Sequence, residues 1–200
     1  MDIVYILAIS QGLFFIVFLL FQKVTTQASY VLISWVLFIC FTLTVSYTQE
    51  IGLMREYPFL IGLDLAVPYT CGPFLWIYTQ LITGNSKKLT WRSLVHLTPF
   101  FVYSIYLYIV LISKSDQYKL ALLNQTINPF TITQIMIAQG SKVIHALIYT
   151  IFTYVLISKY QQKIKSQFSS IEHINLRWLQ VILLGILTVT IIMGLILVNG

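Results

Sequence analysis

The stretch that decides the fold reads PFLIGLDLAVPYTCGPFLWIYTQLIT, residues 58–83. It exceeds the roughly 20 residues that a helix needs to cross a bilayer, yet it contains an acid at Asp64, internal prolines at Pro68 and Pro73, and a glycine between them at Gly72. Each proline removes a helical hydrogen bond, which would free the carbonyls of Asp64 and Tyr69. Freed backbone groups in hydrocarbon must be satisfied by protein or trapped water. We therefore expect a kinked helix packed inside a bundle, and a purely structural kink without a ligand is the simpler interpretation.

The rest of the chain is also poor in charge and rich in apolar side chains. Of 200 residues, 58% are hydrophobic and 9% are charged, and the mean hydropathy is +0.85. A soluble protein of this length could not cover its surface with so few charges. Both cysteines, Cys40 and Cys71, fall within apolar runs, so we interpret them as core residues rather than as a disulfide.

Apolar runs of spanning length recur along the chain and predict an all-α, polytopic helical membrane bundle. The predicted spans are six, at about residues 3–21, 30–47, 58–83, 94–113, 131–158 and 176–198. The lipid bilayer is therefore the first expected partner.

Basic residues are distributed unevenly between the links that join these spans. The links after the first, third and fifth spans carry eight, and those after the second and fourth carry three. Because positive links stay in the cytoplasm, this asymmetry predicts that the N-terminus lies outside. Six spans would then leave the end of the chain outside as well.

Among the ionisable residues within predicted spans, Asp64, Lys142 and His145 stand out as candidates for function, because charge in a membrane is costly. Lys142 and His145 share one helical face, with Gln139 nearby. From the rise of a helix, Asp64 lies about 9 Å and Lys142 about 16 Å from the outer ends of their spans. We expect an Asp64–Lys142 pair bordering an outward-facing polar cavity that also involves Tyr69. A buried structural pair or a snorkelling lysine is the alternative.

Catalytic and metal-binding patterns are missing from the sequence. The three histidines, His96, His145 and His173, sit on different elements without the spacing of metal ligands. The chain contains no H-E-x-x-H, G-x-S-x-G or P-loop motif. We therefore expect no enzyme, no cofactor and no metal site.

The link before the last span carries a more specific pattern. Ser169 and Glu172 have the spacing of a capping box, and the basic run before them suits the surface of the anionic inner leaflet. This link, with Asn175 and Trp178, either relays movement between the last two spans or is a plain surface linker.

At this link the sequence resembles a known family. The run YQQKIKSQFSSIEHINLRWL, residues 160–179, is similar to a signature of bacterial membrane-bound AraC-type transcription regulators. Their pattern is met by Ser169, Glu172, Asn175, Leu176, Trp178 and Leu179. A second resemblance is GPFLWIY, residues 72–78, and a third is the short basic loop that leads to His96 and Pro99.

The resemblance implies a multi-span sensor in the bacterial inner membrane that controls a cytoplasmic helix-turn-helix domain. It would respond to a small molecule or an envelope signal, and a homodimer is a further candidate assembly. No helix-turn-helix pattern occurs in these 200 residues, so a seventh span and a DNA-binding domain are expected beyond them, and DNA is a partner only through that domain. The resemblance carries no ligand-binding motif.

Two other functions stay open. In a small transporter, the proline-broken third span with Asp64, Lys142 and His145 would form a midplane site. A scaffold subunit without a ligand would show stable partners only.

Overall fold

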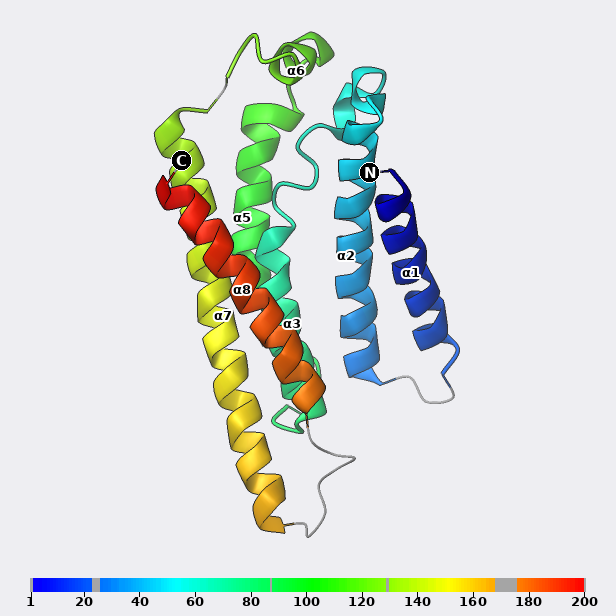
Figure 1. Ribbon diagram of the computed structural model, residues 1–200, viewed down its shortest axis with the longest axis vertical. Helices are drawn as coiled ribbons and strands as arrows, with labels where there is room; N and C mark the ends of the chain where they lie inside the picture. The colour runs from blue at the N-terminus through cyan, green and yellow to red at the C-terminus, as the bar shows by residue number, and fades with distance from the viewer. Residues whose placement is uncertain (1, 23–25, 87, 129, 168–175, 200) are drawn as a thin grey trace.

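The computed structural model describes residues 2–22, 26–86, 88–128, 130–167 and 176–199, and this part of the chain is helical without strands (Figure 1). The fold class is therefore all-α, as predicted. The α-helices are α1 (Asp2–Leu20), α2 (Gln27–Glu50), α3 (Pro68–Ile82), α4 (Trp91–Leu94), α5 (Thr98–Leu107), α6 (Asp116–Leu123), α7 (Ile132–Gln167) and α8 (Arg177–Asn199). Short 3₁₀ turns occupy Leu53–Arg55, Pro58–Leu60 and Val95–Leu97, and a π turn, Tyr108–Ile112, continues α5.

Within the part of the chain that the structure describes, five helical segments are long and apolar enough to cross a membrane. They are Ile3–Leu20, Gln27–Glu50, Trp91–Ile112, Ile132–Gln167 and Arg177–Leu197. Their outward side chains are largely aliphatic or aromatic, for example Phe14, Ile105 and Leu184. Such a surface is consistent with a multi-pass membrane protein, because in lipid the helices satisfy their own backbone groups and need no polar exterior.

The expectation of one kinked helix over residues 58–83 is wrong. The first part of this segment is a series of turns, and the helix α3 begins only at Pro68. Proline suits that first helical position because its missing N–H would have had no helical partner there. The carbonyl of Asp64 is not left free, since it accepts the N–H of Val67 at 2.9 Å. Only Pro73 is internal to the helix.

The turns before α3 depend on a glycine. Gly62 has a φ of +88°, which side chains other than glycine rarely adopt, and a Cβ there would collide with the side chain of Leu111. Leu111 belongs to a buried cluster with Val45, Met54 and Ile61. The chain therefore turns tightly against the end of α2 before it enters α3.

The helix α3 lies at the centre of the bundle, between α2 and α7 and in contact with α5 (Figure 1). Its Leu75 packs with Ile157 of α7 and Leu179 of α8, and on the opposite side its Phe74 packs with Val31 of α2. Residues 68–82 therefore do pack inside a bundle, as expected for this stretch.

The helix α7 is longer than the predicted fifth span. It runs to Gln167 instead of ending near residue 158, so residues 159–167 continue the helix and are not a separate linker. In Figure 1 this end of α7 projects beyond the other helices. The predicted capping residues Ser169 and Glu172, and Asn175 of the same link, lie outside the described residues.

Both ends of the described chain lie at one end of the bundle, together with the short helix α6 (Figure 1). The end of α1, the turn after α3 and the end of α7 lie at the opposite end. That opposite end carries Lys88, Arg92, Lys159, Lys163 and Lys165. We call it the basic end.

Candidate functional site

A cavity of about 540 Å³ lies between α3, α5 and α7. Its walls combine apolar side chains with hydroxyl and amide groups. The lining residues are Tyr69, Pro99, Val102, Tyr103, Tyr106, Gln134, Ile137, Ala138 and Ser141. We call it the tyrosine cavity. Its volume lies within the range, about 300–1,000 Å³, of pockets that bind small molecules.

A hydrogen-bonded group joins α3 to α7 at the inner wall of this cavity. The buried Tyr69 hydroxyl is hydrogen-bonded to Ser141 Oγ, and it also donates to the carbonyl of Ala138 at 3.4 Å. Ser141 Oγ lies 2.9 Å from that same carbonyl. Tyr69, one of the predicted site residues, lines this cavity, and its hydroxyl contacts Ser141.

The structure does not place Asp64 and Lys142 in a direct ion pair. Within the described residues, no carboxylate oxygen lies within 4.0 Å of Lys142 Nζ. The two charges are close enough to interact through space. Lys142 Nζ instead lies 5.2 Å from the ring centroid of Tyr103, in the geometry of a cation–π interaction. The lysine therefore lies against Tyr103, a wall residue of the tyrosine cavity, although it is not itself one of the lining residues.

His145 continues the same face of α7 toward the basic end. Its ring lies 5.5 Å from that of Tyr69 and 4.8 Å from that of Tyr149, measured between centroids. Its buried Nε2 has no hydrogen-bond partner among the described residues. Tyr149 in turn is hydrogen-bonded to His96 Nδ1 at 2.8 Å.

Gly72 sets the distance between α3 and α7 at this level. A Cβ built on Gly72 would lie 2.7 Å from Cβ of Tyr149 and 2.9 Å from its Cγ. Real Cβ atoms do not approach so closely, so only glycine lets α3 approach Tyr149 of α7 as closely as it does here. Gly72, predicted as part of a kink, thus serves a close helix approach, as small residues do in membrane bundles.

Other predicted site residues lie apart from this cavity. Gln139 is half-buried on α7 but does not line the tyrosine cavity. Trp178, predicted as part of a relay link, begins α8 and meets the ring of Tyr78 edge-on at 6.2 Å. That contact joins the start of α8 to α3.

Sequence reasoning missed the part played by Tyr149 and His96. The signal was present, because Ser141, His145 and Tyr149 recur every four residues and so occupy one face of a helix. For His96 the sequence indicates only that its spacing does not suit a metal ligand. Its partner lies 53 residues away in the chain, and no local pattern reveals such a contact.

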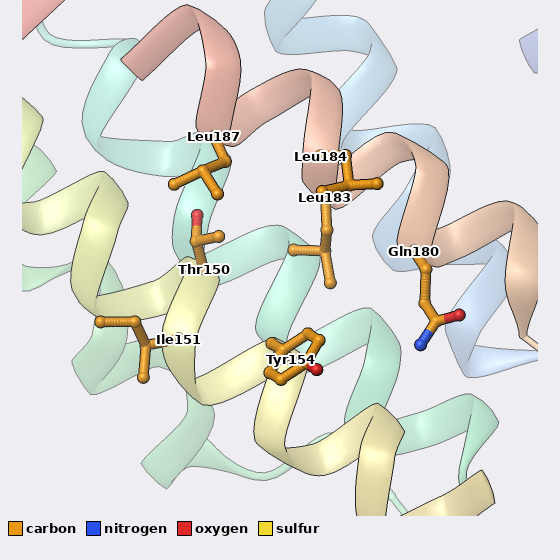
Figure 2. Close-up of a pocket in the computed structure, with 7 residues that line it drawn as sticks. All are labelled: Thr150, Ile151, Tyr154, Gln180, Leu183, Leu184 and Leu187. Carbon is orange, nitrogen blue, oxygen red and sulfur yellow. The ribbon is translucent and has the colours of Figure 1, made fainter. Parts of the chain in front are cut away.

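A second cavity, of about 480 Å³, lies between α7 and α8. Figure 2 shows it bordered by Thr150, Ile151, Tyr154, Gln180, Leu183, Leu184 and Leu187. Its lining is mostly aliphatic. Its polar groups are few and separated, so this space offers no convergent set of hydrogen-bonding groups.

The chemistry available in the tyrosine cavity is recognition by aromatic walls, hydroxyl groups and one cation. Among the residues that the structure describes, no three His, Cys, Asp or Glu side chains gather as metal ligands. A scan against protein-family models, a search of curated proteins and a search of solved structures each find no match.

Proposed function

We propose that this chain is a membrane-embedded signal-input domain in which α7 carries movement from the tyrosine cavity to the basic end. The observation that supports it is the continuity of α7. One uninterrupted helix, Ile132–Gln167, includes the cavity wall at Ser141, the aromatic contacts of His145 and Tyr149, and the exposed Lys163. Its 36 residues correspond to about 54 Å of helix. A ligand that changes the cavity wall would tilt or shift this rod.

The domain would cross the bacterial inner membrane six times, with its N-terminus outside and its basic end in the cytoplasm. The helix α3 has 15 residues and is about 22 Å long, shorter than a hydrocarbon core of about 30 Å. The turns before it would complete the third crossing, where the surrounding helices can satisfy their backbone groups. The basic residues of the cytoplasmic end follow the positive-inside rule.

The output is proposed from the sequence resemblance. The run from residue 160 to residue 179 is similar to membrane-bound AraC-type regulators, so α7 and α8 would pass the movement to a cytoplasmic helix-turn-helix domain. Reading the gene beyond codon 200 tests this part. A further apolar span followed by a basic helix-turn-helix region supports it, and an immediate stop codon overturns it.

A small transporter is the second candidate, and the turns before α3 favour it. Irregular backbone next to a half-length helix is typical of transporter binding sites. In that case Asp64, Lys142 and His145 would serve substrate movement. Uptake of a solute into proteoliposomes that contain the 200-residue chain would favour this function over signal input.

Distance measurement between two spin labels tests the movement of α7. The labels are placed on Lys163→Cys, at the basic end of α7, and on Asn85→Cys, in the exposed turn after α3, with Cys40 and Cys71 replaced by alanine. Ser141→Leu removes the hydroxyl and fills the cavity wall, so it imitates a ligand. We expect it to shift the label distance by about 2 Å, the scale of helix movements in switching proteins.

The matched control is Ile144→Leu, which changes an exposed side chain one turn along the same helix. It should leave the distance unchanged. If Ser141→Leu folds and gives the same distance distribution as Ile144→Leu, α7 does not carry movement from the cavity and the proposed function is wrong.

A further inference from the structure

The tyrosine cavity opens sideways, toward the lipid. Two of its lining residues, Val102 on α5 and Ile137 on α7, are 60% and 66% exposed, and they lie within segments that are apolar enough to span a membrane. The hydroxyl groups of Tyr69 and Ser141 lie at the protected, inner side. A molecule from the lipid phase would meet apolar side chains first and hydrogen-bonding groups afterwards.

Lys142 adds a cation next to Tyr103, a lining residue of this cavity, and among the described residues it has no direct counter-ion. An ammonium group in a spanning segment is costly unless a partner of opposite charge or a polar contact offsets the cost. Asp64 attracts it only through space, and the ring of Tyr103 contributes a weak cation–π contact. The hydrogen-bond donors of Nζ therefore remain available to an anion that enters the cavity.

The cavity is too small for a whole membrane lipid and suits a single molecule of drug-like size. An occupant that matches its walls has an apolar chain that packs against Val102 and Ile137. The part of that chain next to the polar head packs against the ring of Tyr103. Its polar head accepts the one hydrogen bond that Ser141 otherwise gives to the Ala138 carbonyl, and it carries a negative charge for Lys142. A fatty acid has these features in one chain.

We infer that the tyrosine cavity binds a single-chain anionic amphiphile, a fatty-acid carboxylate, that enters from the lipid phase. The carboxylate lies toward Lys142 and Ser141, and the chain leaves between α5 and α7 past Ile137. This inference rests on the proposed function in one respect, because the fatty acid would be the signal that α7 transmits.

Equilibrium binding of radiolabelled oleate to the 200-residue chain in zwitterionic nanodiscs tests the inference, with empty nanodiscs correcting for partition into lipid. Unlabelled oleate, oleyl alcohol and oleylamine share one chain but are negative, neutral and positive at the head. We expect oleate to compete at least tenfold more strongly than the other two. If all three compounds compete equally, the inference is overturned. This comparison uses the unaltered protein.

Variants then locate the site. Lys142→Met should weaken oleate binding about tenfold, the loss of one charge-assisted contact of about 1.4 kcal/mol, whereas Lys142→Arg should retain it. Ile137→Trp should obstruct the opening, and Ile144→Trp, on an equally exposed position of α7 that does not line the cavity, should not. Unchanged binding in both Lys142→Met and Ile137→Trp contradicts the inference.

Two further outcomes separate the possible causes. If phosphatidylglycerol in the nanodisc displaces oleate as well as free oleate does, the occupant is a phospholipid headgroup and the inference is wrong. Binding is measured here without regard to α7 movement. If oleate binds tightly but does not change the distance between labels at positions 85 and 163, the proposed function alone is contradicted. If Ser141→Leu changes that distance but oleate does not bind, only this inference is contradicted.

Discussion

The two sides of α7 are held by different kinds of contact. Toward α3 and α5, the helix makes hydrogen bonds through Ser141 and Tyr149 and approaches α3 as closely as Gly72 allows. Toward α8, its contacts are mainly aliphatic, with one hydrogen bond from Gln180 Nε2 to Gln161 Oε1 at 3.3 Å, and a Cβ on Gly194 would meet Val143 at an ordinary 3.7 Å. Apolar packing distinguishes poorly between positions of two helices in lipid, because lipid tails are equally apolar. We therefore expect the α3 side to fix the position of α7 more strongly than the α8 side does.

Gly72 should show the largest difference between the two sides. Gly72→Ala forces its Cβ into Tyr149 and should destabilise the protein by about 1–3 kcal/mol, the cost typical of overpacking. Gly194→Ala is the matched control on the α8 side, where alanine has room and should be neutral or stabilising. Reversible unfolding in mixed micelles measures both. Equal stability of the two variants would show that the α3–α7 approach is not tightly determined.

Thr153 should show an intermediate effect. Its side chain is fully buried on α7, and its Oγ1 has no hydrogen-bond partner among the described residues. Thr153→Val keeps the shape and removes an unsatisfied polar atom, so it should stabilise the protein by about 1 kcal/mol. Thr79, equally buried on α3, donates to the carbonyl of Leu75 at 2.8 Å, so Thr79→Val should bring no gain. A loss of stability in Thr153→Val would mean that its hydroxyl has a partner after all.

Tyr69 should show the smallest effect on stability. Tyr69→Phe removes the hydrogen bond to Ser141 and should cost about 0.6 kcal/mol, the mean for contacts between membrane helices. Tyr154→Phe on the outer side of α7 serves as control, because that side chain is 57% exposed. The same unfolding assay compares them. A larger loss in Tyr154→Phe than in Tyr69→Phe would reverse the assignment of the two sides.

Much of this fold follows from the sequence because the membrane imposes a simple rule, that spanning segments are long, apolar and helical. Residues 58–83 do not follow that rule, because turns precede the helix that begins at Pro68. Pro68 is compatible both with a kink and with the first position of a helix, and sequence alone does not choose between them. The positive φ of Gly62 and its contact with Leu111 decide the matter, and both belong to tertiary structure.

The sequence indicated some residues of the candidate site but not which side chains they contact. The cost of charge in a membrane singled out Asp64, Lys142 and His145. The partner of Lys142 depends on the rotation of α5, which presents Tyr103 rather than a carboxylate. The extension of α7 was missed because residues 159–167 are polar, and polarity marks the end of an apolar run without ending a helix.

The most direct test of the account asks whether an unbroken α7 is required to transmit movement. Ser158→Gly with Lys159→Gly softens the helix between the cavity and the basic end, since each glycine costs about 1 kcal/mol of helix stability. The paired alanine variant is the control. With spin labels at positions 85 and 163, the distance shift caused by Ser141→Leu should persist with the alanines and vanish with the glycines. A shift that survives the glycines would contradict the claim that α7 acts as a rigid rod.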